Sequence, residues 1–370
     1  MRTNVRIARV AGIEIGVNWT WLIVFGLVVW SLGARVFPAE EPGLARVTYW
    51  AMAAVAALVF FAAILLHELG HSLVARREGV EIEEITLWLL GGVARLRGQM
   101  ASPGGEFRIA VAGPLVSLAI AVILLLVAAF LPLPPAYDAT IFWIGYINAF
   151  VLVFNLLPAL PLDGGRILHS ALWGGRRDLV WATRVGTAIA RGVAWLLVGG
   201  GIALFVFGVA EGGIWLAFIG WFLDVAARAE ERQVLAEARL EGLRVRDLMV
   251  ARPVTVEADQ TIGQVMDEVA HLHRHSSYPV LAAGRPVGLL PFRCVAKTPR
   301  GAWDERLVRD CMLPREEVPT VPEDESAADA LQELAQNDVR RALVVDDGHL
   351  AGLLSLADLM RMAQRRSARR

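Results

Sequence analysis

Six apolar segments between residues 19 and 226 limit this chain to folds in which helices cross a lipid bilayer. A bilayer core about 30 Å thick needs roughly 20 apolar residues of helix. The segments that meet or approach this length are Trp19–Val36, Tyr49–Val74, Ile109–Leu131, Thr140–Leu157, Thr187–Val209 and Gly213–Ala226. The last is the shortest, because residues 211–213 have to turn the chain between two closely spaced spans. Six spans are expected, with five or seven as alternatives.

The charge distribution divides the chain into a membrane part and a soluble part. Hydrophobic residues make up 56% of the 370 residues and charged residues 20%, which is too apolar for a soluble globule of this size. Residues 1–240 hold 35 charged side chains and residues 241–370 hold 38. Their formal charges, +1 and −2, give neither part the basic face that nucleic-acid binding needs. We therefore expect the lipid bilayer, and no nucleic acid, as a partner. The two cysteines, Cys294 and Cys311, make up no disulfide framework and fit a reducing compartment.

The arginines indicate which side of the membrane each loop occupies. With six spans and the N-terminus inside, the outer loops hold only Arg35 and Arg46, which Glu40 and Glu41 offset. Nearly all other arginines of the membrane part then fall on the cytoplasmic side. We expect both termini there, in a bacterial inner membrane, since a single lysine among 36 basic residues indicates a GC-rich genome. A cleaved signal peptide at the first span is the disfavoured alternative, because its removal would invert the arginine-rich loops.

A pair of histidines near the end of the second span carries the chemistry. Residues 67–71 have the pattern His-Glu-x-x-His inside an apolar helix. The spacing puts His67 and His71 on one helix face, where both imidazoles can bind one Zn²⁺, with Glu68 beside the water that such an ion would carry. Ionisable groups at membrane depth cost roughly 2.5 kcal/mol or more each, so three in five residues indicate a compensating ion. The pattern predicts a metalloprotease site; hydrated groups at a helix end are the alternative.

A catalytic zinc site needs a third protein ligand and an open position for water. Asp163 is the best candidate, because two prolines end the fourth span just before it and two glycines just after it permit a tight turn. From the residues alone, a helix cap or a partner for Arg166 is an equal alternative. Two weaker candidates for the third ligand are Asp224 and His169.

Two further features lie close to the expected site. Asn155, about two helical turns before Asp163, could donate a hydrogen bond to a substrate carbonyl, or could bond to a neighbouring helix. Residues 85–92 are apolar but too short to cross the bilayer, and Gly91 and Gly92 fit a re-entrant turn or a short hairpin at membrane depth.

These motifs resemble those of the site-2 protease family of intramembrane zinc metalloproteases. The resemblance covers roughly residues 10–175 and rests on residues 67–71, on Ala112-Gly113-Pro114-Leu115 and on the run from Asn155 to Gly165. It implies that His67, His71 and Asp163 bind one Zn²⁺ per chain and that Glu68 activates water for peptide hydrolysis. It also implies that Asn155 helps to position substrate and that Gly91 and Gly92 belong to a hairpin that holds an extended substrate by strand addition. The implied substrates are transmembrane segments of membrane-tethered regulatory proteins.

The soluble part contains an internal repeat with a spacing of about 64 residues. Residues 245–249 match residues 308–312, and residues 288–290 match residues 352–354, so residues 243–363 hold two copies of one unit. The repeat resembles a tandem pair of cystathionine-β-synthase-type (CBS) domains. This resemblance implies a module that often binds AMP or ATP, and a homodimer through the CBS pair is left open.

The nucleotide signature of the CBS family is intact in one copy only. The resemblance assigns Asp358 to ribose hydroxyls and Ser355 to the phosphate, whereas the first copy has Pro291 and Cys294 at the matching positions. One nucleotide site at most is supported, and a structural or dimerisation module that binds nothing is the equal alternative.

The expected fold is a polytopic α-helical membrane domain of about six transmembrane helices followed by a cytoplasmic α/β tandem CBS module. The expected domains are a transmembrane zinc metalloprotease domain over residues 1–230, a linker over 231–242, and CBS domains over 243–303 and 304–370, the second with a basic tail. The expected function is zinc-dependent intramembrane proteolysis modulated by adenine nucleotide. A CBS-regulated channel or transporter is the alternative, and it leaves both protease motifs unexplained. An inactive homologue is a further alternative, against which the intact Glu68 argues.

Overall fold

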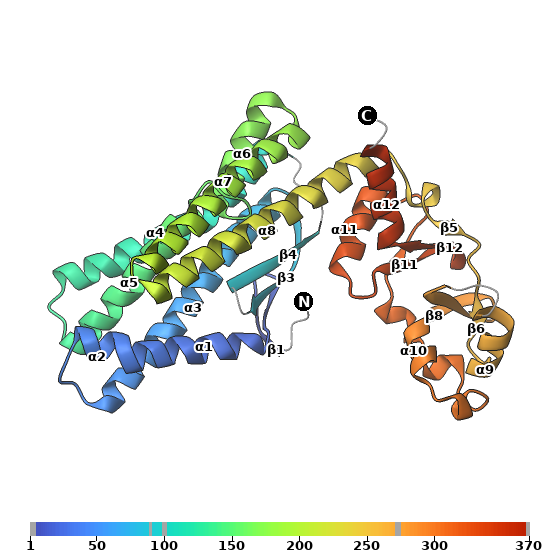
Figure 1. Cartoon of the computed structure of the whole chain (residues 1–370), viewed down its shortest axis with the longest axis horizontal. Helices are drawn as coiled ribbons and strands as arrows, with labels where there is room; N and C mark the ends of the chain where they lie inside the picture. The colour runs from blue at the N-terminus through green and yellow to red at the C-terminus, as the bar shows by residue number, and fades with distance from the viewer. Residues whose placement is uncertain (1–4, 89–90, 98–101, 271–274, 368–370) are drawn as a thin grey trace. The chain divides into compact units, whose positions relative to one another are not determined.

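Long apolar helices make up most of the first 240 residues (Figure 1). A computed structural model of the chain describes residues 5–88, 91–97, 102–270 and 275–367, and the chain divides into two units, residues 1–231 and residues 232–370. In the described residues, six helical segments are long and apolar enough to cross a membrane, as predicted. The first of them, Thr20–Glu40, comprises α1 (Thr20–Ser31), a π-helical turn (Leu32–Val36) and α2 (Phe37–Glu40). The other five are α3 (Arg46–Arg77), α4 (Pro103–Phe130), α5 (Pro135–Asn155), α7 (Leu179–Val206) and α8 (Ala210–Leu240).

Caps and small residues explain how these helices begin and pack. The side chain of Ser102 accepts a hydrogen bond from the Gly105 backbone at the start of α4, and Asp178 does the same for Trp181 at the start of α7. Helices α4 and α5 run side by side (Figure 1), and a Cβ on Gly145 would lie 3.0 Å from Leu125 Cγ. Small residues thus let the helices approach closely, as is usual in membranes.

A four-stranded sheet with the order β1-β2-β3-β4 accompanies the helices of the first unit. Its strands are β1 (Val5–Val10), β2 (Ile13–Val17), β3 (Glu81–Trp88) and β4 (Gly91–Arg97). Strand β2 pairs in parallel with β3, while the pairs β1–β2 and β3–β4 are antiparallel. The hairpin expected around Gly91 is therefore present, but it is half of a larger sheet. Sequence analysis missed the β1–β2 hairpin, whose turn residues Ala11 and Gly12 both have positive φ angles, 50° and 84°, as a type I′ turn requires.

A short helix, α6 (Asp163–Arg176), follows the break after α5. Two glycines let the chain fold back on itself there. A Cβ on Gly164 would lie 2.2 Å from the Leu156 carbonyl oxygen, and one on Gly165 would lie 2.4 Å from the Ala159 carbonyl carbon. No larger residue fits either position, so the glycines fix where α6 and its first residue begin.

The second unit contains two four-stranded sheets that exchange strands between the repeats. One has the order β10-β11-β12-β5 and the other the order β6-β7-β8-β9. The strands of the first are β10 (Thr320–Val321), β11 (Arg341–Asp346), β12 (His349–Ser355) and β5 (Val250–Ala251); those of the second are β6 (Val256–Glu257), β7 (Ser277–Ala282), β8 (Arg285–Pro291) and β9 (Leu313–Pro314). Their helices are α9 (Ile262–Gln264), α10 (Phe292–Lys297), α11 (Ala327–Gln336) and α12 (Leu356–Ser367). Each sheet takes its last strand from the other copy, so the folded halves do not coincide with two successive stretches of sequence.

Two details of the second unit differ from what the sequence suggests. Residues 231–240, expected within a linker, form the last part of α8, and Ala236 and Leu240 are buried in the core of the second repeat. Cys294 and Cys311 form a disulfide bond across a separation of 17 residues, although sequence analysis found no disulfide framework. The sequence could not reveal this bond, because spacing along the chain does not report proximity in space.

Candidate metal centre

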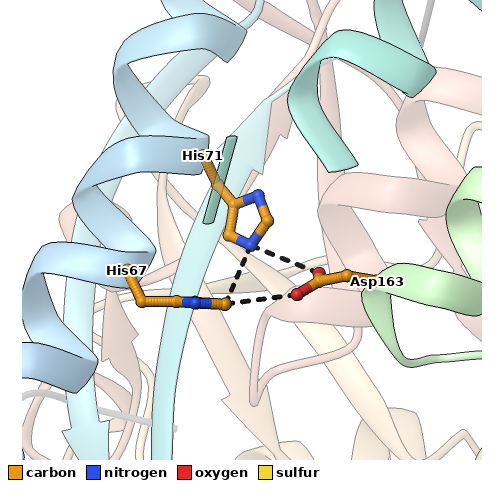
Figure 2. Close-up of side chains that lie close together, drawn as sticks. All are labelled: His67, His71 and Asp163. Carbon is orange, nitrogen blue, oxygen red and sulfur yellow. Dashed lines mark hydrogen bonds and ion pairs between the residues drawn. The ribbon is translucent and has the colours of Figure 1, made fainter. Parts of the chain in front are cut away.

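His67 and His71 lie one helical turn apart on α3 and point toward Asp163, the first residue of α6 (Figure 2). Their Nε2 atoms are 3.1 Å apart, and each lies 3.2 Å from one carboxylate oxygen of Asp163. Among the described residues, these three form a group whose ligand atoms all lie within 4.8 Å of one another. The structure thus brings together the two histidines and the aspartate that the sequence singled out.

The outer nitrogens of both imidazoles contact α4. His71 Nδ1 lies 2.7 Å from the Ile109 carbonyl oxygen, and His67 Nδ1 lies 3.0 Å from Ser117 Oγ. Because a carbonyl oxygen can only accept, His71 donates from Nδ1 and keeps the lone pair of Nε2 facing Asp163. The Ser117 hydroxyl can donate or accept, and in the tautomer of His67 that leaves Nε2 free for a metal, Nδ1 donates to it. Such outer contacts fix the orientation and tautomer of metal-binding histidines.

The space and the donors at this point fit a Zn²⁺ ion. A Cβ on Gly113 of α4 would lie 2.2 Å from His71 Nε2 and 2.7 Å from His67 Nε2, so only glycine leaves room beside the two nitrogens. Asp163 Oδ2 is buried and has no hydrogen-bond partner in the described part of the chain. Two imidazole nitrogens and one carboxylate oxygen are the donor set of a catalytic zinc site with one open position.

The charge of Asp163 also suits a metal ligand. Burial would raise the pKa of Asp163, but the two imidazoles beside it, those of His67 and His71, lower that pKa to about 2. The carboxylate is therefore ionised at neutral pH.

Glu68 lies beside the histidines and against the backbone of β4. A Cβ on Gly92 would lie 2.4 Å from Glu68 Cγ, so the strand passes directly over this side chain. Strand β4 is at one end of the four-stranded sheet, and its outer edge is not paired with another strand of that sheet. The last strand of this sheet thus runs next to the carboxylate expected to act as a base, and its outer edge pairs with no other strand among the described residues.

The weaker candidates for the third ligand are engaged elsewhere. His169 Nδ1 lies 2.8 Å from Glu106 Oε2, and its Nε2 lies 3.0 Å from Thr183 Oγ1. Asp224 contacts Arg191 and Arg228. Asn155 is half-buried at the end of α5, and its role stays a prediction.

Sequence reasoning missed Ser117, which contacts His67, and did not say what Gly113 does. Ser117 is a lone hydroxyl in an apolar span, and the sequence does not distinguish it from a serine that bonds within its own helix. Gly113 stood within a matched motif, yet only the structure shows that its missing side chain makes room for the histidines.

A separate cavity of about 740 Å³ lies within the second unit, between its two repeats. Its polar lining includes Ser276, Arg293, Arg340, Arg341 and Ser355. Arg341 donates a 2.6 Å hydrogen bond to Ser276. Burial lowers the pKa of Arg341, and the like charge of Arg293 lowers it further, while Asp358 acts in the opposite direction. Three arginines and one carboxylate, that of Asp338, line the cavity, so positive charge is in excess on its wall.

Ser355 and Asp358 contact each other at the start of α12. The Ser355 hydroxyl donates a 2.5 Å hydrogen bond to Asp358, and Asp358 also pairs with Arg361. Ser355 lines the cavity, and Asp358 lies one turn further along the helix.

Family models match both parts of the chain. The model described as peptidase family M50 matches residues 55–138 and 133–199, and the model described as the CBS domain matches residues 245–298 and 308–365.

Similar proteins extend over nearly the whole length. A protein of Mycobacterium tuberculosis named "Putative zinc metalloprotease Rip3" is 36% identical over 367 residues, which cover 98% of this chain and 93% of the relative. "Zinc metalloprotease MJ0392" of Methanocaldococcus jannaschii is 30% identical over 98% of this chain and 96% of its own length. A solved structure titled "Site-2 Protease from Methanocaldococcus jannaschii" is 31% identical, covers 61% of this chain and 94% of that chain, and has a TM-score of 0.43.

Proposed function

This chain belongs to peptidase family M50 and is a membrane metalloendopeptidase, and on that premise we propose that it cleaves transmembrane segments of membrane-tethered regulatory proteins. The observation that carries the proposal is the position of Glu68, which directly follows the metal-binding candidate His67 on α3 and packs against Gly92 of β4, the last strand of its sheet. The alternative of a channel or transporter leaves this arrangement unexplained.

His67, His71 and Asp163 are the residues that would hold one Zn²⁺. When bound, the ion polarises a substrate carbonyl and makes water more acidic. Ser117 and the Ile109 carbonyl oxygen keep the histidine rings oriented, and Gly164 and Gly165 keep Asp163 at the start of α6. The site therefore needs little rearrangement before it binds metal.

Glu68 moves the proton. Its carboxylate takes a proton from the attacking water and gives it to the departing amine, as a general base and then a general acid. The Gly92 backbone packed on its Cγ restricts where the carboxylate can point.

The outer edge of β4, which pairs with no other strand in the part of the chain that the structure describes, would offer backbone hydrogen bonds to an extended substrate. In a helical substrate the carbonyls are already hydrogen-bonded, so the segment has to unwind before it can be cut. Gly91 and Gly92 permit close approach of the two backbones beside Glu68, and Asn155 would donate a hydrogen bond to the substrate. We expect the cut near residues that disfavour helix, such as glycine and proline.

The arginine distribution supports an orientation with both termini in the cytoplasm of a bacterial inner membrane. In that orientation the second unit meets cytoplasmic nucleotides. We propose that one AMP or ATP molecule binds in the cavity of about 740 Å³, a volume typical of small-molecule sites. Ser355 and the arginines of the wall would contact phosphate and Asp358 the ribose.

Metal content and cleavage test the catalytic proposal together. The detergent-purified full chain should contain close to one zinc, measured by mass spectrometry, and His67→Ala and Asp163→Ala should lose it. His349→Ala, which changes an exposed histidine of the second unit, is the matched control and should keep it.

Glu68→Gln should keep the zinc and lose cleavage of a purified single-span protein with two glycines in its membrane segment. Glu40→Gln, at an exposed glutamate of the first unit, should cleave normally. A folded wild-type protein without zinc, or undiminished cleavage by Glu68→Gln, would overturn the proposal.

Calorimetric titration of the full chain with AMP and ATP tests the nucleotide proposal. Ser355→Ala and Asp358→Asn should weaken binding. Ser326→Ala is a matched control. Ser326 precedes α11 in the same module, just as Ser355 precedes α12. Absence of binding to the wild-type chain at millimolar concentration would leave the CBS pair a structural module.

A further inference from the structure

Arg166 lies three residues after Asp163 on α6 and contacts α8. Its Nη2 atom is 3.3 Å from Glu230 Oε1. The second carboxylate oxygen of Glu230 is buried and has no hydrogen-bond partner in the described part of the chain. Removing the guanidinium would therefore leave a largely buried carboxylate without compensation, which is strongly unfavourable.

The guanidinium of Arg166 stands among several carboxylates. The charge of Glu230 raises the pKa of Arg166 against the effect of burial. Three further carboxylates act in the same direction: those of Glu106, Asp163 and Glu68. Arg166 is thus a cation whose charged form is stabilised by carboxylates of α3, α4, α6 and α8, and it contacts the carboxylate of Glu230 directly.

Helix α6 is short and is held by polar contacts on more than one side. His169 connects it to Glu106 of α4 and to Thr183 of α7. The ion pair of Arg166 adds the connection to α8. Since Asp163 is the first residue of α6, the placement of this helix decides where the carboxylate lies relative to His67 and His71.

We infer that Arg166 is a positioning residue, which through Glu230 ties α6, and with it Asp163, to helix α8. Neither residue needs to touch substrate or metal for this role. A small shift of α8 changes the Arg166–Glu230 contact and moves Asp163 relative to the histidines.

Helix α8 itself continues from the first unit into the second. Ala236 and Leu240, in its last turns, are buried in the core of the second repeat. Glu230 and Ala236 are six residues apart on one uninterrupted helix, or about 9 Å along its axis. Helix α8 is thus the covalent route by which nucleotide bound in the second unit would act on Arg166. This last step rests on the nucleotide binding proposed above and adds to it that binding changes the rate of cleavage.

A double-mutant cycle in the full chain tests the positioning role. Arg166→Gln and Glu230→Gln should each weaken zinc binding roughly 10- to 100-fold, as loss of an outer contact of a metal site does. Zinc affinity is measured by competition with a chelating dye. The double variant should bind zinc at least as tightly as the more impaired single variant, because both changes remove the same contact. In cleavage of the single-span reporter protein, kcat should fall and KM should stay constant.

Arg191→Gln is the matched control. Arg191 of α7 pairs with Asp224 of α8 at 3.0 Å and, in the described part of the chain, forms no ion pair with α6, so its loss should leave zinc affinity and kcat unchanged. If Glu230→Gln does not fold, Glu230→Asp keeps the charge on a shorter side chain, and an intermediate loss is expected. Unchanged zinc affinity in the Arg166 and Glu230 variants, or effects that multiply in the double variant, would overturn the inference.

The nucleotide response separates this inference from the proposal on which it rests. Glu230→Gln should still bind AMP or ATP but should no longer change its kcat when nucleotide is added. If the wild-type chain binds nucleotide without a change in kcat, nucleotide does not regulate cleavage through α8. The double-mutant cycle then still tests the positioning role of Arg166. A Glu230→Gln variant with a normal response contradicts the transmission along α8.

Discussion

Gly113 and His71 occupy neighbouring space so tightly that a Cβ on residue 113 would lie 2.2 Å from His71 Nε2. Helix α3, which presents the histidines, can thus pack against α4 at this point because residue 113 has no side chain. Gly113→Ala should displace both imidazoles and abolish zinc binding and cleavage, although alanine is the better helix former. Zinc content of the purified variant measures this. Gly192→Ala, at a helical glycine with nothing within 4 Å of the added carbon, should keep its zinc.

Ser117→Ala removes the hydroxyl that lies 3.0 Å from His67 Nδ1. The ring loses the contact that fixes its orientation, so zinc affinity should fall roughly 10- to 100-fold. Competition with a chelating dye gives the affinity. Ser72→Ala is the control, because Ser72 is an equally buried serine of α3 whose hydroxyl has no partner in the described residues. Equal affinities in the two variants would show that Ser117 does not orient His67.

Gly92→Ala should separate metal binding from catalysis. The added carbon would lie 2.4 Å from Glu68 Cγ and none of the three metal-binding candidates is among its nearest neighbours. The variant should therefore retain zinc, like Glu68→Gln, and cleave the single-span reporter protein far more slowly. Mass spectrometry and a gel-based cleavage assay on the same preparation check both statements. Normal cleavage would mean that β4 does not restrain the glutamate.

Glu325 is expected to destabilise the second unit at neutral pH. Burial raises the pKa of Glu325 above its ordinary value of 4.5, and Glu333 and Asp329 raise it further. The ionised form is then less favourable in the folded than in the unfolded chain, so the free energy of unfolding falls as the pH rises through the raised value. Glu325→Gln should slow hydrogen exchange in α11 at pH 7, and the difference should shrink toward pH 4.5. Glu316→Gln, at an exposed carboxylate, should have no such effect.

Reduction of the Cys294–Cys311 disulfide should lower the stability of the second unit. The bond joins two cysteines 17 residues apart in sequence. In the chain-entropy account, removing a cross-link over a loop of about this size lowers the free energy of unfolding by about 3 kcal/mol. Calorimetry of the full chain with and without reductant measures the shift in the unfolding temperature. The double variant Cys294→Ser/Cys311→Ser should unfold at the lower temperature in both conditions. If reductant still lowers the unfolding temperature of this variant, the effect does not come from the Cys294–Cys311 disulfide.

The membrane spans were predictable because hydropathy is a property of local sequence. The approach of His67 to His71 was predictable for the same reason, since helical spacing alone puts them on one face. Asp163 was an even choice from the residues, and the resemblance to a family raised it. The structure then brings it within 3.2 Å of both histidines.

Features that depend on distant pairing were not predictable. Strand β2 pairs with β3, and Glu14 lies opposite Glu84, some 70 residues away in sequence. The alternation in residues 5–17 is too short to distinguish a strand from a polar terminus. The strand exchange of β5 and β9 was hidden as well, because the two repeats are contiguous in sequence but interleaved in space.

The disulfide has a consequence for how the second unit saturates with ligand. The repeat spacing puts Cys294 at the position that Asp358 holds in the second copy, so the disulfide stands where the second repeat has the carboxylate proposed to bind ribose. With this carboxylate in one repeat alone, the proposed nucleotide site is single. The dose–response curve of one chain is then hyperbolic, with no threshold. A steeper curve would have to come from association between chains.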